Sequence, residues 1–358
     1  MTYFLGFLLA FLLSIGATKL TIKWANKYGF VDNPKRSHSA ILHDRPIPRA
    51  GGVPVYVATL LTVLLFSGQL IGGYDANIKH LIGIFLAGAG IVILGLFDDK
   101  YDLSAHLRLW LMFLLAIVVV GFGIGITFIT NPLGGVLRLD DLIYVFHFAG
   151  SMHSIVIFAD ILAIFWIVSL MNVVNWSSGL DGQNAGIAMI TLAILGFSAL
   201  RYNQTSEPTA LLAFIASGAY AGFLLFSAYP QKIMPGFGGS TFSGFMIAVL
   251  SILSGAKLAT ALIVLAIPIL DSIWVVFRRI YNKQNPLKNT RTHLHHYLLD
   301  IGWSKRRIAF FYWLICAILG ILVLQINSQT KLFVFLVLLL LFLAGVLWLQ
   351  RLLRSSNR

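Results

Sequence analysis

The chain has 358 residues, of which 58% are hydrophobic and 11% are charged. Soluble domains average about 45–50% apolar and about 25% charged residues, so this composition excludes an ordinary soluble protein. Lys and Arg number 26 against 13 Asp and Glu. Because the basic residues lie between long apolar runs, this charge indicates membrane topology rather than nucleic-acid binding. The single cysteine, Cys316, excludes a disulfide framework and a thiolate zinc site.

Eleven apolar runs predict transmembrane helices, since a bilayer core of about 30 Å requires roughly 20 apolar residues per helix. The runs are 3–22, 51–68, 80–97, 109–129, 155–172, 185–200, 209–228, 242–254, 258–277, 308–326 and 332–350. The eighth run is short, and joining it to the ninth gives an alternative with ten spans. The sequence therefore predicts an all-α polytopic membrane protein with about eleven transmembrane helices and one integral-membrane domain over residues 1–358.

The distribution of basic residues predicts the orientation. With the N-terminus outside, the inner connections contain 20 of the Lys and Arg residues. The outer connections contain five: Lys79, Arg138, Arg201, Lys257 and Lys331. This bias places the inner connections in the cytosol. The first run has no Lys or Arg before Lys19, which favours a retained helix over a cleaved signal peptide.

An outer segment of about 25 residues begins at Pro132. Its alternation of apolar and polar residues is poor, so we expect a loop there rather than a short hairpin.

Three carboxylates lie where the third run ends. Asp98 and Asp99 are adjacent, and Asp102 follows about one helical turn later, so a continuing helix would place them on one face. Such a set suits a Mg²⁺ ion that also binds substrate phosphates. The alternative is a group of helix-end acids paired with Lys100 and Arg108.

The segment from Asn172 to Gly182 is rich in Asn and Gly and follows an apolar run directly. Asn172 and Asn175 could donate to phosphate or sugar oxygens, and the glycines would let backbone N–H groups approach an anion. A helix C-cap with a turn would use the same residue types.

Histidines gather in the large basic loop before the tenth run. His293, His295 and His296 lie close to Arg291, a combination that suits a pyrophosphate better than a metal cation. Solvated loop histidines are the alternative. The first inner loop is also basic and contains Lys35, Arg36, His38, His43, Arg45 and Arg49.

Five segments in this order resemble the motifs of the polyprenyl-phosphate N-acetylhexosamine-1-phosphate transferase family, and the resemblance covers most of the chain. They are Pro46–Gly52, Phe97–Asp102, Asn172–Gly182, Pro268–Asp271 and His293–His296. In the form of its histidine motif and in its predicted number of spans, the chain most resembles the UDP-N-acetylhexosamine branch of that family.

The resemblance implies transfer of a sugar-1-phosphate, GlcNAc-1-phosphate above all, from a UDP-sugar to undecaprenyl phosphate, with Mg²⁺ and release of UMP. It implies membrane lipid as a partner and a cytosolic active site in a bacterial plasma (inner) membrane, and leaves a homodimer open. Its implied catalytic and Mg²⁺-binding residues are Asp98, Asp99 and Asp181. Its implied substrate-binding residues are Arg49, Asp102, Asn172, Asn175, Asp271, Arg291, His293, His295 and His296.

Three departures from the family pattern bear on activity. Ser178 and Phe237 stand where the family usually has Asp, and an acid commonly found before the histidine motif is absent near Asn289 and Thr290. Losing an Asp at a Mg²⁺ site removes a hard oxygen ligand. The alternative function is therefore a catalytically impaired family member that acts as a binding or scaffold subunit. A transporter is disfavoured, because the polar clusters lie at one membrane boundary and the sequence shows no half-repeat.

Overall fold

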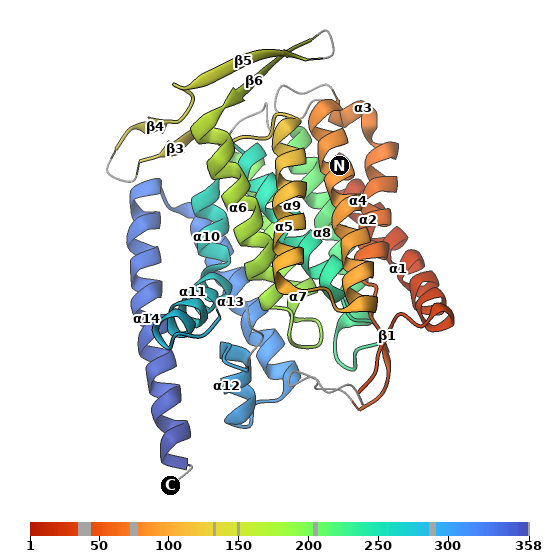
Figure 1. Ribbon diagram of the computed structural model, residues 1–358, viewed down its shortest axis with the longest axis vertical. Coiled ribbons are helices and arrows are strands. Elements are labelled where there is room, and N and C mark those ends of the chain that lie inside the picture. The colour runs from red at the N-terminus through yellow and green to blue at the C-terminus, as the bar shows by residue number, and fades with distance from the viewer. Residues whose placement is uncertain are drawn as a thin grey trace.

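A computed structural model describes residues 1–34, 44–71, 78–131, 134–148, 151–202, 207–255, 257–285 and 291–356. Its helices form one bundle, with strands at both ends (Figure 1). The long helices are α1 (Thr2–Tyr28), α4 (Ile78–Tyr101), α6 (Ile157–Trp176), α7 (Gln183–Tyr202), α8 (Glu207–Ser227), α9 (Gly236–Leu253), α13 (Lys305–Gln325) and α14 (Ser328–Ser356). The shorter helices are α2 (Gly52–Leu65), α3 (Ser67–Leu70), α5 (Ala105–Gly121), α10 (Leu258–Val264), α11 (Ala266–Tyr281) and α12 (Leu294–Asp300).

Within the described segments, eight helices are long and apolar enough to cross a membrane, or nine if α10 and α11 count as one bent span. Helices α2 and α5 are apolar but have only 14 and 17 residues. Each of the eleven predicted runs overlaps one of these helices or the bent pair, and α9 and α10 are separate helices. The prediction of an all-α multi-pass membrane protein is confirmed, and helix length and composition support eight or nine of the predicted eleven crossings.

The ninth predicted run is not one straight helix. Helices α10 and α11 meet at an angle of 81° on either side of Leu265. Pro268 lies in the first turn of α11 and has no N–H to donate to the carbonyl of Val264, the last residue of α10. The bend turns α11, which contains Asp271, away from the direction of the bundle (Figure 1).

The expectation of a loop after Pro132 is wrong for most of that segment, although residues 132, 133, 149 and 150 lie outside the described residues. Strand β3 (Phe128–Thr130) pairs antiparallel with β4 (Val136–Arg138), and β5 (Ile143–Phe148) pairs antiparallel with β6 (Ser151–Val156). Ile143, Tyr144 and Val145 are all exposed. Alternation of apolar and polar residues does not reveal this strand, because apolar side chains on both faces of β5 remain exposed. The β-branched and aromatic residues still favour an extended backbone.

Helix α9 lies at the centre of the bundle, because 94% of the residues in its most apolar stretch are buried. The corresponding share for α14 is 17%. Helix α9 crosses α4 at very short range: a Cβ on Gly95 would lie 2.1 Å from the Cα of Gly238. Glycine at this crossing lets the two backbones approach. The same approach brings the end of α4 to the beginning of α9.

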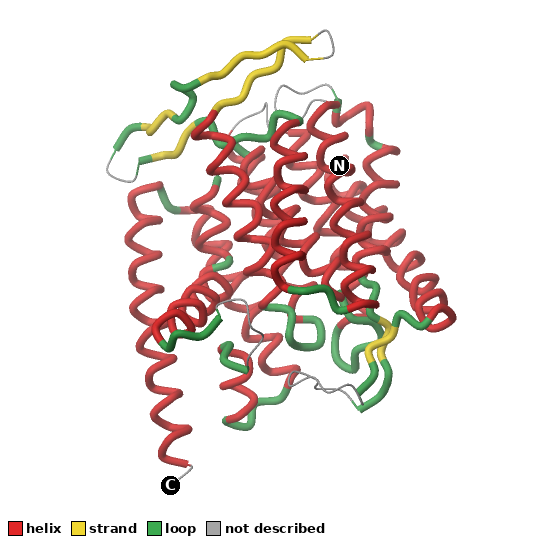
Figure 2. Tube along the Cα trace, viewed as in Figure 1, coloured by secondary structure: helices red, strands yellow, loops and turns green. Residues whose placement is uncertain are grey.

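The two ends of the bundle differ in structure (Figure 2). The site face is the end at which α4 stops and α9 begins, and it includes α12 and the short pair formed by β1 (Val31–Asp32) and β2 (Ile47–Pro48). The hairpin face is the opposite end and carries strands β3–β6 (Figure 1).

Candidate functional site

Asp99 joins three segments that are distant in sequence. Its Oδ1 atom lies 2.8 Å from Nε of Arg49 and also accepts the backbone N–H of Phe237 at 3.1 Å. Its side chain is 2% exposed, whereas that of Arg49 is 26% exposed. A Cβ on Gly236 would clash with Oδ2 of Asp99, so the beginning of α9 must come this close through a glycine. Asp99 therefore holds Arg49 at the edge of the site.

Asp98 forms a second, separate ion pair. Nη1 of Arg108, a residue of the first turn of α5, donates to both carboxylate oxygens at 3.2 Å. The guanidinium carbon also lies 5.3 Å from the ring centroid of Phe237, a cation–π distance. Phe237 thus stands beside Arg108 at the position where the family usually has an acid.

The prediction that Asp102 shares a helical face with Asp98 and Asp99 is wrong. Helix α4 ends at Tyr101, and Asp102 has a left-handed backbone with φ of 54°. Its N–H donates to the carbonyl of Asp98, and the residue is exposed. The carboxylate therefore lies in the turn after the helix.

The two predicted asparagines lie in α6 rather than in a loop. Asn172 donates to the carbonyl of Val168 in the preceding turn. Asn175 accepts from Oγ of Ser240 at 2.6 Å, which ties α6 to the first turns of α9. The hydroxyl of Ser178 donates to the carbonyl of Asn175, as expected at a helix C-terminus. The C-cap alternative therefore describes Ser177 and the turn that continues through Ser178, while Asn175 connects two helices of the site.

Asp181 lies between two other segments of the site face. Its Oδ2 accepts the N–H of Gln231 at 3.3 Å, and its Oδ1 lies 3.9 Å from Nζ of Lys305. This carboxylate positions the connection between α8 and α9 next to the beginning of α13.

Asp271 orients the histidine motif. Its Oδ1 accepts the N–H of Leu294 at 2.8 Å, and its Oδ2 lies 2.8 Å from Nδ1 of His293. In this contact Nδ1 is the ring nitrogen that faces the carboxylate of Asp271. The ring of Trp176 lies 6.2 Å from that of His293, so the motif is placed against the end of α6.

The other two histidines are buried and neutral at pH 7. Burial, followed by the nearby cations and histidines, lowers the pKa of His296 to about 4 and places the pKa of His295 well below its ordinary value. A Cβ on Gly179 would lie 2.4 Å from Nε2 of His295, so the glycine-rich segment lies directly on the histidine motif. Arg291 forms an exposed ion pair with Asp300 at 3.5 Å.

The residues present do not fit the predicted three-carboxylate Mg²⁺ site. Asp98 and Asp99 each bind an arginine, and Asp181 contacts Gln231 and Lys305 instead of joining them. Across the described parts of the chain, groups of three or more His, Cys, Asp or Glu side chains arranged to hold a metal ion are absent. A Mg²⁺ ion here would have to draw most of its ligands from substrate phosphates and water.

Three contacting residues were not predicted as part of the site: Arg108, Gln231 and Ser240. The sequence indicates Arg108 only as a charge partner of the helix-end acids. Its place in the first turn of a helix that follows two acids is a feature that could have identified it as a site residue. Several predicted loop residues lie outside the described residues, and these are Lys35, Arg36, His38, His43, Asn289 and Thr290.

Known proteins resemble this chain over most of its length. The profile described as glycosyl transferase family 4 matches residues 81–255. The chain is 30% identical to the probable undecaprenyl-phosphate N-acetylglucosaminyl 1-phosphate transferase of Bacillus subtilis, over 91% of this chain and 85% of that protein. It is 30% identical to the decaprenyl-phosphate N-acetylglucosaminephosphotransferase of Mycolicibacterium smegmatis, over 81% and 73% of the two chains. It is 28% identical to the undecaprenyl-phosphate alpha-N-acetylglucosaminyl 1-phosphate transferase of Escherichia coli K12, over 83% and 77%. The chain therefore belongs to glycosyl transferase family 4.

Proposed function

We propose that this protein transfers N-acetylglucosamine 1-phosphate from UDP-N-acetylglucosamine to undecaprenyl phosphate and releases UMP, on the cytosolic side of a bacterial plasma membrane. The observation that carries the proposal is the pair of half-buried arginines, Arg49 and Arg108, held by Asp99 and Asp98 on the face that also carries the histidine motif. The names of two relatives support undecaprenyl phosphate as the acceptor, the third names decaprenyl phosphate, and all three support N-acetylglucosamine as the sugar. The excess of Lys and Arg on the same face supports the cytosolic orientation.

The reaction exchanges one phosphorus–oxygen bond for another. An oxygen of the lipid phosphate attacks the phosphorus atom that bears the sugar. The bond from that phosphorus to the oxygen bridging to UMP breaks, and UMP leaves with the bridging oxygen. Both reactants are anions, so the main task of the protein is to hold them in line and offset their charge.

The geometry gives the two adjacent carboxylates positioning roles. A buried Asp99 that already accepts two N–H groups is poorly placed to take a proton from a substrate. It instead fixes Arg49 through Nε, as Asp98 fixes Arg108 through Nη1, and the remaining N–H donors of each guanidinium can bind phosphate oxygens. Neutral His295 and His296 each carry one N–H and add donors without adding charge.

A second candidate function is supported by one specific observation. Phe237 replaces an acid of the family pattern, and its ring packs against Arg108. This arrangement suits a catalytically impaired member that binds a nucleotide sugar or a polyprenyl phosphate without turnover.

A double-label experiment distinguishes the two candidates. The purified full-length chain receives UDP-N-acetylglucosamine labelled with ¹⁴C in the sugar and ³²P in the β-phosphate, together with undecaprenyl phosphate. The proposed reaction moves both labels into the lipid phase in equal ratio. Transfer of ¹⁴C alone would mean glycosyl transfer with release of UDP and would overturn the proposal. Retention of both labels in the aqueous phase would favour the impaired member.

Matched arginine variants connect the activity with the site. Arg49→Gln removes one of the two held guanidiniums, and we expect it to lower transfer by roughly 100-fold or more, because charge-assisted hydrogen bonds to phosphate are lost. Arg138→Gln removes an arginine on the hairpin face and should leave transfer unchanged. An equal effect of both substitutions would contradict the assignment of Arg49.

A further inference from the structure

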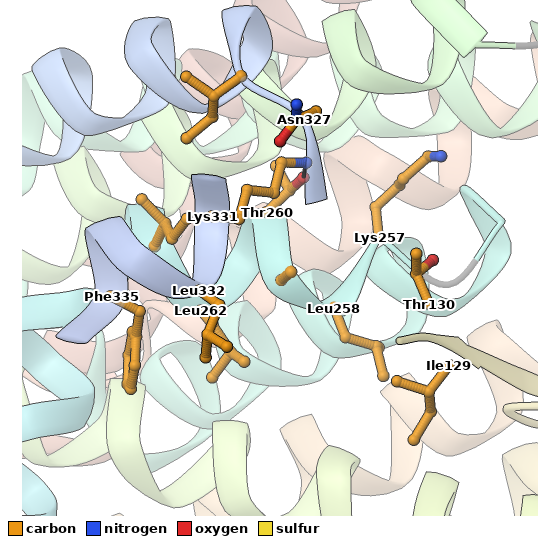
Figure 3. Close-up of a pocket in the computed structure, with 13 residues that line it drawn as sticks. Ile129, Thr130, Lys257, Leu258, Thr260, Leu262, Asn327, Lys331, Leu332 and Phe335 are labelled. Atoms are coloured by element: carbon orange, nitrogen blue, oxygen red, sulfur yellow. Dashed lines mark hydrogen bonds between the residues drawn. The ribbon is translucent and has the colours of Figure 1, made fainter. Parts of the chain in front are cut away.

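A cavity of about 350 Å³ lies on the hairpin face, far from the candidate site. Its walls come from β3, from α10 and the residue before it, and from the end of the α13–α14 connection and the first turns of α14. The labelled polar residues, among them Lys257, Thr260, Asn327 and Lys331, gather on one side of it, and Leu262 and Phe335 lie on the other side (Figure 3).

Lys331 is the central polar residue of this cavity. It belongs to α14, within a segment apolar enough to span a membrane, yet its side chain is buried at 8% exposure. Its Nζ atom donates to Oγ1 of Thr260 on α10 at 3.1 Å (Figure 3). A lysine near the end of a transmembrane helix usually extends to the aqueous interface. Lys331 instead lines a protein cavity, where a bound anion would offset its charge.

The cavity carries an excess of positive charge. Lys257 lines it together with Lys331, and Arg201 is a further cation in the electrostatic environment of Lys331. The described residues that line the cavity include no Asp or Glu. Two ammonium groups that line one cavity repel each other, and an anion bound between them would offset that repulsion.

The beginning of α14 adds to this preference for an anion. Asn327 caps the helix by accepting from the N–H and the hydroxyl of Thr330, both at 2.9 Å. The positive end of the dipole of this 29-residue helix lies at Asn327, which also lines the cavity.

Along α14, the residue that contributes to the polar part of the cavity comes first, and a residue of the apolar part follows it. Phe335 follows Lys331 by four residues, so the two share one face of the helix and Phe335 lies one turn deeper in the bundle. A ligand that follows this face would place an anionic group at Lys331 and an apolar group against Phe335 and Leu262.

We propose that this cavity binds a phosphate-bearing amphiphile, with the phosphate between Lys257 and Lys331 and the hydrocarbon part against the apolar wall. The site is independent of the transfer reaction, because it lies at the opposite end of the bundle from Asp98 and Asp99. The proposed site also gives a role to Lys257 and Lys331, two of the five basic residues in the predicted outer connections.

Binding to the full-length protein in uncharged detergent tests the proposal. The probes are dioctanoyl phosphatidic acid, dioctanoylglycerol and inorganic phosphate, and saturable binding is measured by native mass spectrometry and by the shift of the melting temperature. We expect phosphatidic acid to bind at least about tenfold more tightly than either other probe, since each of those supplies only half of the recognised chemistry. Equal affinity for phosphatidic acid and inorganic phosphate would overturn the amphiphile assignment, and absence of saturable binding by phosphatidic acid would overturn the site.

Variants locate the binding. Lys331→Met and Lys257→Met should each weaken phosphatidic acid about tenfold or more, because each loses a charge-assisted hydrogen bond. Lys331→Arg keeps the charge and should retain binding. Lys79→Met removes an exposed lysine at the beginning of α4 and is the matched control. If Lys331→Met fails to fold, Lys257→Met and Lys331→Arg still decide the question. Unchanged affinity in Lys257→Met, or equal loss in Lys79→Met, would overturn the proposal.

Discussion

Arg108 donates from a single nitrogen, Nη1, to both carboxylate oxygens of Asp98, each at 3.2 Å. The carboxylate is almost fully buried, and the guanidinium is 19% exposed. The acid is thus the inner member of the pair and the arginine the outer member, which makes Arg108 the group that a phosphate would meet. The pair of Asp99 and Arg49 repeats the same order, and its carboxylate contacts the first turn of α9.

Asp98→Asn and Asp99→Asn are each expected to lower transfer by roughly 100-fold or more, because an arginine released from its carboxylate no longer presents its donors in a fixed geometry. The measurement is the initial rate of sugar phosphate transfer by protein that inserts and purifies normally. Near-normal rates in both variants would remove these acids from the reaction.

A charge-neutral double variant separates stability from activity. Asp98→Asn leaves the partly buried Arg108 without its charge partner, and losing a hydrogen bond to a charged group costs about 1.5–3 kcal/mol. Asp98→Asn combined with Arg108→Gln should therefore recover much of the thermal stability that Asp98→Asn loses, while transfer remains low. Recovery of transfer together with stability would mean that the pair is only structural.

Gly179→Ala should disturb the histidine motif, because the added Cβ would lie 2.4 Å from Nε2 of His295. We expect a fall in transfer of roughly tenfold with little loss of the folded protein, since the displaced group is one side chain. Gly16→Ala, in a helix with open space around the glycine, is the matched control and should have wild-type activity. Wild-type activity of Gly179→Ala would show that His295 is not needed in this position.

The histidine motif predicts a loss of stability in acid. Burial holds the pKa of His296 at about 4, below the value of about 6.5 in an unfolded chain. The unfolded state therefore binds the proton first, and the contribution of this residue to stability is complete above pH 6.5 and falls as the pH decreases toward 4. His296→Gln should flatten the fall of the melting temperature between pH 7 and pH 5. His106→Gln, at an exposed residue, should not, and equal slopes in wild type and His296→Gln would contradict the assignment.

The Mg²⁺ requirement is a separate prediction. Phe237→Asp would add a carboxylate beside Arg108, and a further hard oxygen donor suits this ion. We expect the variant to fold and to need less Mg²⁺ for half-maximal transfer than the wild type does. A Mg²⁺ titration of both proteins with the same activation curve would contradict that expectation.

Sequence patterns predicted the helices and brought candidate residues from several segments to one face, but they did not predict the contacts among those residues. Apolar length predicted the helices because lipid-facing and core-facing residues are both hydrophobic in a membrane protein. The bend at Pro268 and the pairing of β5 with β6 were missed, because one proline is tolerated in many membrane helices and exposed strands do not alternate. The order of motifs placed Asp99, Asp181 and Asp271 on one face. It could not show that each accepts a backbone N–H from another segment, since such contacts exist only after the helices pack.

The most direct test of the account is UMP release by the detergent-purified chain given UDP-N-acetylglucosamine, undecaprenyl phosphate and Mg²⁺, with one control that omits the lipid and one that contains EDTA. The account predicts UMP release that requires the lipid, and the EDTA control reports whether the reaction also requires the metal. Absence of lipid-dependent UMP release with this donor and with a panel of other UDP-sugars would contradict the transferase assignment and identify the chain as a binding member of the family.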